Sequence, residues 1–144
     1  MLCVLYTSLI LRDIVLHDLG GYVSKRLLIV DDEIDLVDAL AAHLEADGYE
    51  VLKALDGKDG YEKVQTQKPD AVLLDLRMPR MDGFQVCRLI KFDDSLKAIK
   101  VIILTAHNSD NEHKIGKSVG ADAFLTKPYE YPNLLETIKG LLGE

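Results

Sequence analysis

The sequence predicts an α/β fold, a doubly wound sheet of five parallel strands with helices on both faces. From Lys25 onward, strand patterns and helix patterns alternate five times. Four of the strand patterns are short apolar runs that end on a polar residue. Buried parallel strands have this form, and their carboxyl ends meet at one edge of the sheet. A chain of 144 residues is long enough for one such domain with its own core.

The first two strand–helix units are expected within residues 27–67. Residues 27–30 form the first apolar run, and apolar residues then recur at helical spacing from residue 34 to residue 44. Gly48 ends this helix because glycine accepts the left-handed conformation of a C-terminal cap. A second strand is predicted at residues 50–55, and a weaker helix at residues 58–67 is ended by Pro69.

The remaining three units follow the same alternation. The third strand is predicted at residues 71–74, followed by a loop at 78–83 and a helix at 84–90. The fourth strand, at residues 101–104, leads to a short helix at 111–119 that stops at Gly120. The fifth strand, at residues 123–125, leads through Pro128 to a last helix around residues 134–142.

The strand order 2-1-3-4-5, the flavodoxin-like order, is preferred to a Rossmann order. Right-handed crossovers place the helices on both faces of the sheet. The switch point of this order lies between strands 1 and 3, which are the two strands followed by carboxylates. Residues 25–144 then form one domain without repeats or linkers, which leaves no room for a second domain.

Residues 1–24 are interpreted as an N-terminal extension outside the fold. The segment is apolar, but Arg12 and Asp13 interrupt it before the ~20 apolar residues that a membrane span needs. It also lacks the basic start of a secretory signal. The alternative is that the native chain starts near Val23.

Composition narrows the classes of partner. With 17 basic and 24 acidic residues, the chain has no basic stripe to neutralise phosphates, so nucleic acids and anionic membranes are not expected as partners. A cation or a protein is more natural. Two cysteines without metal-ligand spacing give neither a disulfide framework nor a zinc site, and the cytoplasm is the expected compartment.

The polar groups at the strand ends predict a site for phosphoryl transfer. They are an acidic pair, a third carboxylate, a hydroxyl and an ammonium: Asp31 and Asp32, Asp75, Thr105, and Lys127. Three carboxylates held together repel one another unless a cation is present, and oxygen ligands alone suit Mg²⁺. A carboxylate can attack a phosphoryl group whose charge is stabilised by metal, ammonium and hydroxyl groups.

Taken together, these motifs resemble the receiver domain of response regulators in two-component signalling. The resemblance covers about 120 of the 144 residues, and it includes the run Asp-Leu-Arg-Met-Pro-Arg-Met-Asp-Gly that starts at Asp75. It implies that Asp75 accepts a phosphoryl group from a sensor histidine kinase or a histidine phosphotransfer protein. It also implies that Asp32 and Asp75 bind Mg²⁺ directly and Asp31 through water, with the carbonyl of Arg77 completing the protein ligands.

The same resemblance assigns roles on the fourth and fifth strands. Thr105 and the amide of Ala106 would hold phosphoryl oxygens, and Lys127 would pair with another. A cis peptide bond before Pro128 would aim Lys127 into the site. Phe124 would be the aromatic switch residue that responds to the hydroxyl of Thr105.

Two positions flank the path that the hydrolytic water takes in the family. Here they are Arg77 and His107, and both can be cationic. Our hypothesis is that these two residues set the lifetime of the acyl phosphate.

The predicted function is therefore a stand-alone receiver that catalyses only its own phosphorylation and dephosphorylation and has no output domain. The alternative is that the chain is a fragment of a larger regulator. Phosphorylation would repack the face formed by the helix at 111–119, the strand at 123–125 and the last helix, which then binds a downstream protein or a second copy. Family homodimers use basic residues of the last helix, and Lys139 is the only one here, so this dimer is left open.

Other interpretations were weighed. A phosphatase of the haloacid-dehalogenase type needs a second Asp where Arg77 stands, and an FMN carrier would suffer repulsion between its phosphate and Asp31-Asp32-Glu33. Taken singly, Asp31, Asp75 and Thr105 could each be a helix cap. Lys127 could be a solvated lysine and Phe124 an ordinary core residue.

Overall fold

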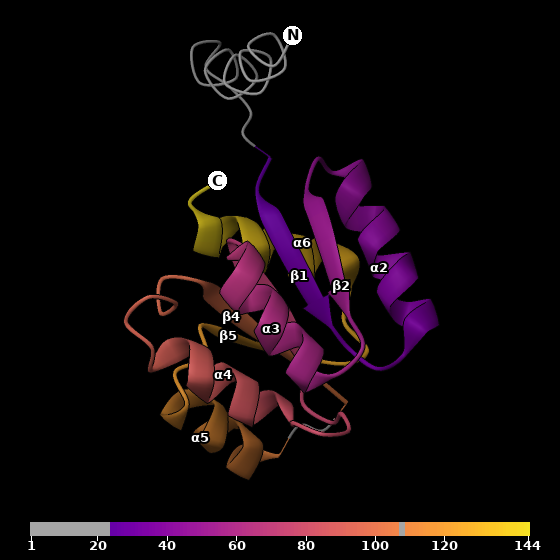
Figure 1. Ribbon diagram of the computed structural model, residues 1–144. Helices are drawn as coiled ribbons and strands as arrows, with labels where there is room; N and C mark the ends of the chain where they lie inside the picture. The colour runs from indigo at the N-terminus through magenta and orange to yellow at the C-terminus, as the bar shows by residue number, and fades with distance from the viewer. Residues whose placement is uncertain (1–23, 107–108) are drawn as a thin grey trace, which may run out of the picture.

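The computed structural model describes residues 24–106 and 109–144, and within them five parallel strands form one sheet (Figure 1). The strand order β2-β1-β3-β4-β5 confirms the predicted one. The strands are β1 (Arg26–Val30), β2 (Glu50–Ala54), β3 (Ala71–Asp75), β4 (Lys100–Thr105) and β5 (Ala123–Thr126). The proposed extension at residues 1–24 lies, except for Ser24, outside the described residues.

Helices cover both faces of the sheet, also as predicted. They are α2 (Ile34–Ala46), α3 (Gly57–Gln67), α4 (Gly83–Lys91), α5 (Asp110–Ser118) and α6 (Tyr131–Leu142). Helices α3, α4 and α5 pack on one face, and α2 and α6 pack on the other (Figure 1). We call these the three-helix face and the two-helix face. No described helix has the length and apolar content needed to cross a membrane.

The alternation of side chains along each strand gives two separate cores. In β1, Leu28 and Val30 belong to the core under the three-helix face, whereas Leu27 and Ile29 belong to the core under the two-helix face. Successive strand residues point to opposite faces, so every central strand has to be apolar on both sides. This is why the sequence shows continuous apolar runs here rather than alternating ones.

The helix caps exclude one of the ordinary interpretations of the site residues. The helices after β1, β3 and β4 have Glu33, Asp82 and Ser109 at their N-caps. Asp31, Asp75 and Thr105 are therefore not the N-caps of the helices that follow them.

The start of α4 is fixed tightly against the end of β3. A side chain at Gly83 would collide with the backbone carbonyl of Asp75, so this position requires glycine. Asp82 and Gln85 form a capping box just before it, with reciprocal hydrogen bonds of 2.9 and 3.0 Å. The loop after Asp75 is thus anchored at its far end, which limits how far its first residues can move.

Candidate functional site

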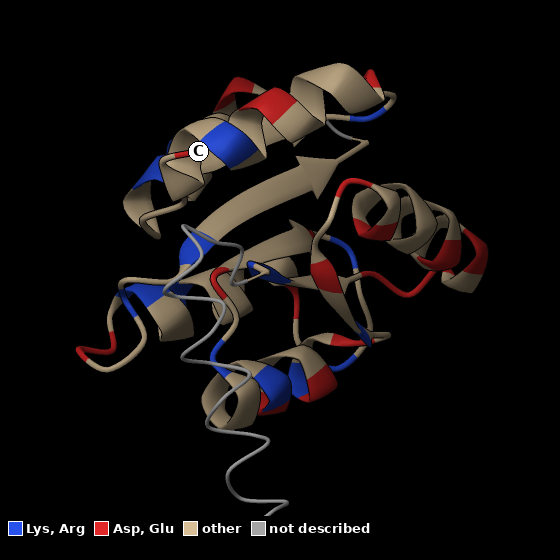
Figure 2. Ribbon diagram, turned by 90° about the horizontal axis from the view of Figure 1, so that it is seen from above, with Lys and Arg blue, Asp and Glu red and all other residues tan. Residues whose placement is uncertain are grey.

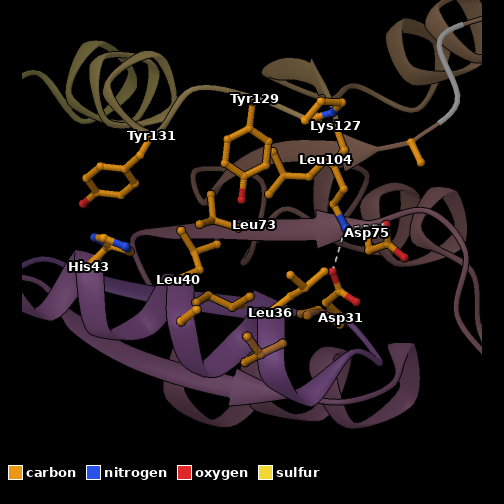
Figure 3. A pocket seen from close by; sticks show the side chains of 16 residues that line it. Asp31, Leu36, Leu40, His43, Leu73, Asp75, Leu104, Lys127, Tyr129 and Tyr131 are labelled. Atoms are coloured by element: carbon orange, nitrogen blue, oxygen red, sulfur yellow. Dashed lines mark hydrogen bonds and ion pairs between the residues drawn. The ribbon is translucent and has the colours of Figure 1, made fainter.

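Strand topology brings the predicted polar residues together at the carboxyl edge of the sheet. The Nζ atom of Lys127, after β5, lies 2.9 Å from Oδ2 of Asp31 and 3.3 Å from Oδ1 of Asp75 (Figure 3). Asp31 follows β1 and Asp75 ends β3, so one ammonium connects three strand ends. These groups are mostly shielded from water, with side-chain exposures of 10% for Asp31, 13% for Asp75 and 20% for Lys127.

Three carboxylates form a cluster that suits a divalent cation. Asp31, Asp32 and Asp75 each offer an oxygen atom, and these atoms lie within 4.8 Å of one another. Asp31 also accepts a hydrogen bond of 3.0 Å from the backbone N–H of Glu33, which fixes its orientation. Asp32 is exposed and makes no hydrogen bond or ion pair with any other residue that the structure describes. An all-oxygen donor set with one free carboxylate fits the ligand preference of Mg²⁺.

Burial and charge act against each other on the titration of the site. Desolvation raises the pKa of Asp75, and the neighbouring charge of Asp31 adds to this, although the Lys127 ammonium and the backbone N–H of Arg77 oppose it. Burial alone would lower the pKa of Lys127, but its hydrogen bond with Asp31 and the charges of both carboxylates raise it overall. The site therefore holds a protonated lysine beside a carboxylate that is costly to ionise without a cation.

The residues expected to read the phosphoryl group occupy the next two strand ends. Thr105 is buried at the end of β4, with 1% exposure, and Ala106 beside it is exposed. The backbone of β5 is fixed here by a hydrogen bond of 2.7 Å from the N–H of Lys127 to the carbonyl of Thr105. The peptide bond between Lys127 and Pro128 is cis. His107 lies outside the described residues.

Phe124 lies on β5, half-buried beneath α5. Its ring contacts the ring of His113, with centroids 4.1 Å apart and planes inclined by 37°. It also packs against the core of the three-helix face. Phe124 is thus a core residue by its packing, and this is compatible with a switching role.

An apolar cleft of about 520 Å³ opens beside the charged groups. It lies between α2 and the connection from β5 to α6, on the two-helix face (Figure 3). Leu36 and Leu40 line it from α2, Leu73 and Leu104 from the sheet, and Tyr129 from the connection. Asp31, Asp75 and Lys127 form one end, so anything bound in the cleft would lie next to the carboxylates.

Comparison with known proteins assigns the family. Residues 27–139 match the response regulator receiver domain. The chain belongs to this family. Receiver domains are signalling domains of two-component systems rather than typical enzymes, and the family binds Mg²⁺ at an acidic pocket such as the one described above.

Two relatives differ in how much of their length this receiver spans. Protein PilH of Pseudomonas aeruginosa is 43% identical over 118 residues, which cover 82% of this chain and 98% of PilH. The alkaline phosphatase synthesis transcriptional regulatory protein PhoP of Bacillus subtilis is 34% identical over 119 residues, 83% of this chain and 49% of that protein. The chain thus spans about half the length of the transcriptional regulators that it matches.

Solved structures agree with the fold. The chemotaxis protein CheY4 of Vibrio cholerae superposes with a TM-score of 0.77 at 31% identity, covering 82% of this chain and 98% of that one. A CheY-like receiver domain protein from Methanospirillum hungatei gives 0.78 at 32% identity, with 83% and 94% covered.

Sequence reasoning missed two features around the site. Glu112, in the first turn of α5, faces Arg77 with 4.0 Å between Oε1 and Nη2, and nothing in the local sequence signals this pair. The second feature is the cap formed by Asp82 at the start of α4. Asp82 is exposed but also forms the capping box, and the spacing of Asp82 and Gln85 could have revealed this.

Proposed function

We propose that this receiver is the phosphoacceptor of a two-component phosphorelay and that Asp75 carries the phosphoryl group. The observation that supports this most is the meeting of Lys127 with Asp31 and Asp75, because it places an ammonium and an adjacent carboxylate cluster around one nucleophile. An oxygen of Asp75 would attack phosphorus while the phosphorus–nitrogen bond breaks in a donor phosphohistidine that carries a proton on its other ring nitrogen. The neutral histidine leaves, and Asp75 holds an acyl phosphate.

In this proposal Asp32 and Asp75 hold Mg²⁺ directly, Asp31 holds it through water, and the carbonyl of Arg77 completes the protein ligands. When bound, the ion supplies charge neutralisation for the phosphoryl oxygens. Thr105, the amide of Ala106 and Lys127 bind those oxygens, and each stands at a strand end that faces the carboxylates. Inward movement of Thr105 would make room for Phe124 to turn, which passes the change to the three-helix face.

The cleft on the two-helix face suits the helix of a phosphodonor. Leu36 on α2 lines the cleft and is 49% exposed. Two further exposed apolar residues lie near the same end of the sheet: Ile34, the first residue of α2, is 55% exposed, and Leu55, which follows β2, is 41% exposed. An amphipathic helix laid in such a groove would cover these side chains and bring a phosphohistidine to Asp75. We therefore propose a sensor histidine kinase or histidine phosphotransfer protein as donor, in the cytoplasm.

Output in this proposal passes through another protein. The face formed by α5, β5 and α6 would bind a downstream target in its phosphorylated form, and a homodimer through that face is the alternative. Arg77 and His107 would set the lifetime of the acyl phosphate. Replacing both with Ala should change the dephosphorylation rate, and an unchanged rate would remove this part of the proposal.

Intact mass spectrometry tests the phosphoacceptor directly. Incubation with acetyl phosphate and Mg²⁺ should add a single adduct of about 80 Da. The adduct should disappear in Asp75→Asn and when EDTA replaces Mg²⁺, whereas Asp82→Asn, at an exposed carboxylate outside the cluster, should retain it. An unmodified chain, or an adduct that persists in Asp75→Asn, would refute the assignment.

The donor surface has its own test. Leu36→Glu should slow transfer from phosphorylated histidine phosphotransfer proteins at least about tenfold relative to transfer from acetyl phosphate, since a charge would be buried in the interface. Phe92→Glu is the matched control, because Phe92 is 68% exposed on the other face of the sheet. Equal effects of the two substitutions would argue against the cleft as donor site.

A further inference from the structure

The ion pair between Arg77 and Glu112 connects the phosphorylation loop to α5. Arg77 lies two residues after Asp75, and its backbone N–H faces the Asp75 carboxylate. Its side chain reaches Glu112 in the first turn of α5, with 4.0 Å between Nη2 and Oε1. Among the described residues of this loop, Arg77 is the one that forms an ion pair with Glu112.

The two partners are unequally placed. The Arg77 side chain is 67% exposed and that of Glu112 only 18%. The second carboxylate oxygen of Glu112, Oε2, is buried and has no hydrogen-bond partner among the described residues. An exposed ion pair of this kind is weak, and a buried carboxylate oxygen without a partner is costly. In the unphosphorylated chain the Arg77 side chain is thus held only weakly, whereas Glu112 depends on Arg77 to balance its charge.

The same turn of α5 also contacts the aromatic residue of β5. His113, next to Glu112, lies on the Phe124 ring with centroids 4.1 Å apart. One turn later, Gly116 approaches this ring so closely that an added Cβ would lie 3.2 Å from Cδ2. A shift of the first turn of α5 would therefore change the packing around the Phe124 ring.

We propose that Glu112 is a positioning residue that holds the Arg77 side chain away from Asp75 until a phosphoryl group competes for it. This inference rests on the proposed phosphorylation of Asp75. The phosphoryl group brings about two negative charges and offers Arg77 paired charge-assisted hydrogen bonds. A single carboxylate at 4.0 Å offers less, so Arg77 moves to the phosphoryl group. Its departure frees the first turn of α5 and with it the contact of His113 and Phe124.

A double-mutant cycle on the rate of phosphorylation tests this exchange. Glu112→Gln keeps the shape of the side chain but releases Arg77 to meet the dianionic donor. With acetyl phosphate and Mg²⁺ followed by intact mass, the rate should rise about two- to fivefold, which is the range of an exposed ion pair. In an Arg77→Gln background the same substitution should have no effect, and in Arg77→Lys it should retain part of its effect.

Asp110→Asn is the matched control, since it removes one negative charge from the same helical turn at an exposed position. It should change the rate less than Glu112→Gln does. Equal effects of these two variants, or an effect of Glu112→Gln that persists without Arg77, would overturn the inference. A wild-type chain that gains no adduct would instead refute the proposed function itself, so the two failures are distinguishable.

Discussion

The two faces of the sheet are covered differently, and the difference separates two tasks. On the three-helix face, α3, α4 and α5 cover a continuous core that reaches Phe124. On the two-helix face, α2 and α6 leave an apolar cleft of about 520 Å³ that ends at Asp31, Asp75 and Lys127. The open face has room to admit a partner beside the carboxylates, and the closed face can transmit a displacement because its residues are in contact. We infer that input arrives at the cleft of the two-helix face. Output then passes through the packed residues under α5, on the three-helix face, to the surface formed by α5, β5 and α6.

Charge reinforces this contrast. The charged residues of α2 are all acidic, namely Asp35, Asp38 and Glu45, whereas α3 carries both signs (Figure 2). These three acidic residues are not among the residues that line the cleft, whose α2 wall is apolar apart from His43. They leave acidic surface elsewhere on the same helix, which would favour a donor with basic residues beside its apolar stripe.

The largest expected effect concerns packing. Ile90 on α4 is fully buried under the three-helix face, and Ile90→Ala should lower the free energy of unfolding by about 2–5 kcal/mol. Leu40 on α2 is only partly buried because it lines the cleft, so Leu40→Ala should cost roughly 1 kcal/mol. Urea titration measures both. Equal losses would mean that the cleft is closed in solution.

A smaller effect concerns the charge cluster. Desolvation and Asp31 hold the pKa of Asp75 above its ordinary value, so the folded state binds its proton more tightly than the unfolded chain does. The contribution of Asp75 to the free energy of unfolding therefore falls as the pH rises from the pKa of this residue in the unfolded chain through its higher pKa in the folded state. The contribution stays at its lower value at neutral pH. The contribution of Lys127 also falls as the pH rises, but in a different range, because its raised pKa gives stability that is present at neutral pH and lost only in alkali.

Asp75→Asn should accordingly raise the melting temperature in EDTA at pH 7 by a few degrees. The gain should vanish below the pKa of an unfolded aspartate, and Mg²⁺ should narrow it by stabilising the wild-type chain. Thermal unfolding at several pH values measures this. A lower melting temperature for Asp75→Asn at pH 7 would show that its contact with Lys127 outweighs the desolvation of the carboxylate.

The sequence predicts the sheet and its strand-end residues better than it predicts how the helices are placed around the sheet. The apolar runs predict the strands, and the topology of a parallel sheet then forces Asp31, Asp75, Thr105 and Lys127 onto one edge. The pairing of Arg77 with Glu112 depends instead on how α5 is rotated about its axis, and no local pattern encodes that rotation.

The cleft was not predictable for a similar reason. Leu36 and Leu40 follow the apolar pattern of a packed helix, and only the placement of α2 relative to Tyr129 and α6 leaves space between them.

The observed helix boundaries differ slightly from the predicted ones, and the cause is local. Helix α4 begins at Gly83, one residue before the predicted start, because the capping box of Asp82 fixes it there.

The smallest expected effect compares two glycines, each within a helix on a different face. Gly140 on α6 has open space around it, so Gly140→Ala should stabilise the protein by about 0.5–1 kcal/mol. Gly116 on α5 lies against Phe124, and the same change should give no gain because the ring must move. Urea titration of the two variants checks this, and equal gains would mean that Phe124 is free to shift at no cost.

Amide hydrogen exchange, measured with and without acetyl phosphate and Mg²⁺, tests the central claim most directly. We predict that exchange changes in α5 and β5 of the phosphorylated chain, and that the last turns of α2 keep their rates. Asp75→Asn in the same mixture should show no change. A stoichiometric adduct that leaves α5 and β5 unaltered, or a response confined to α2, would contradict the assignment of output to the face formed by α5, β5 and α6.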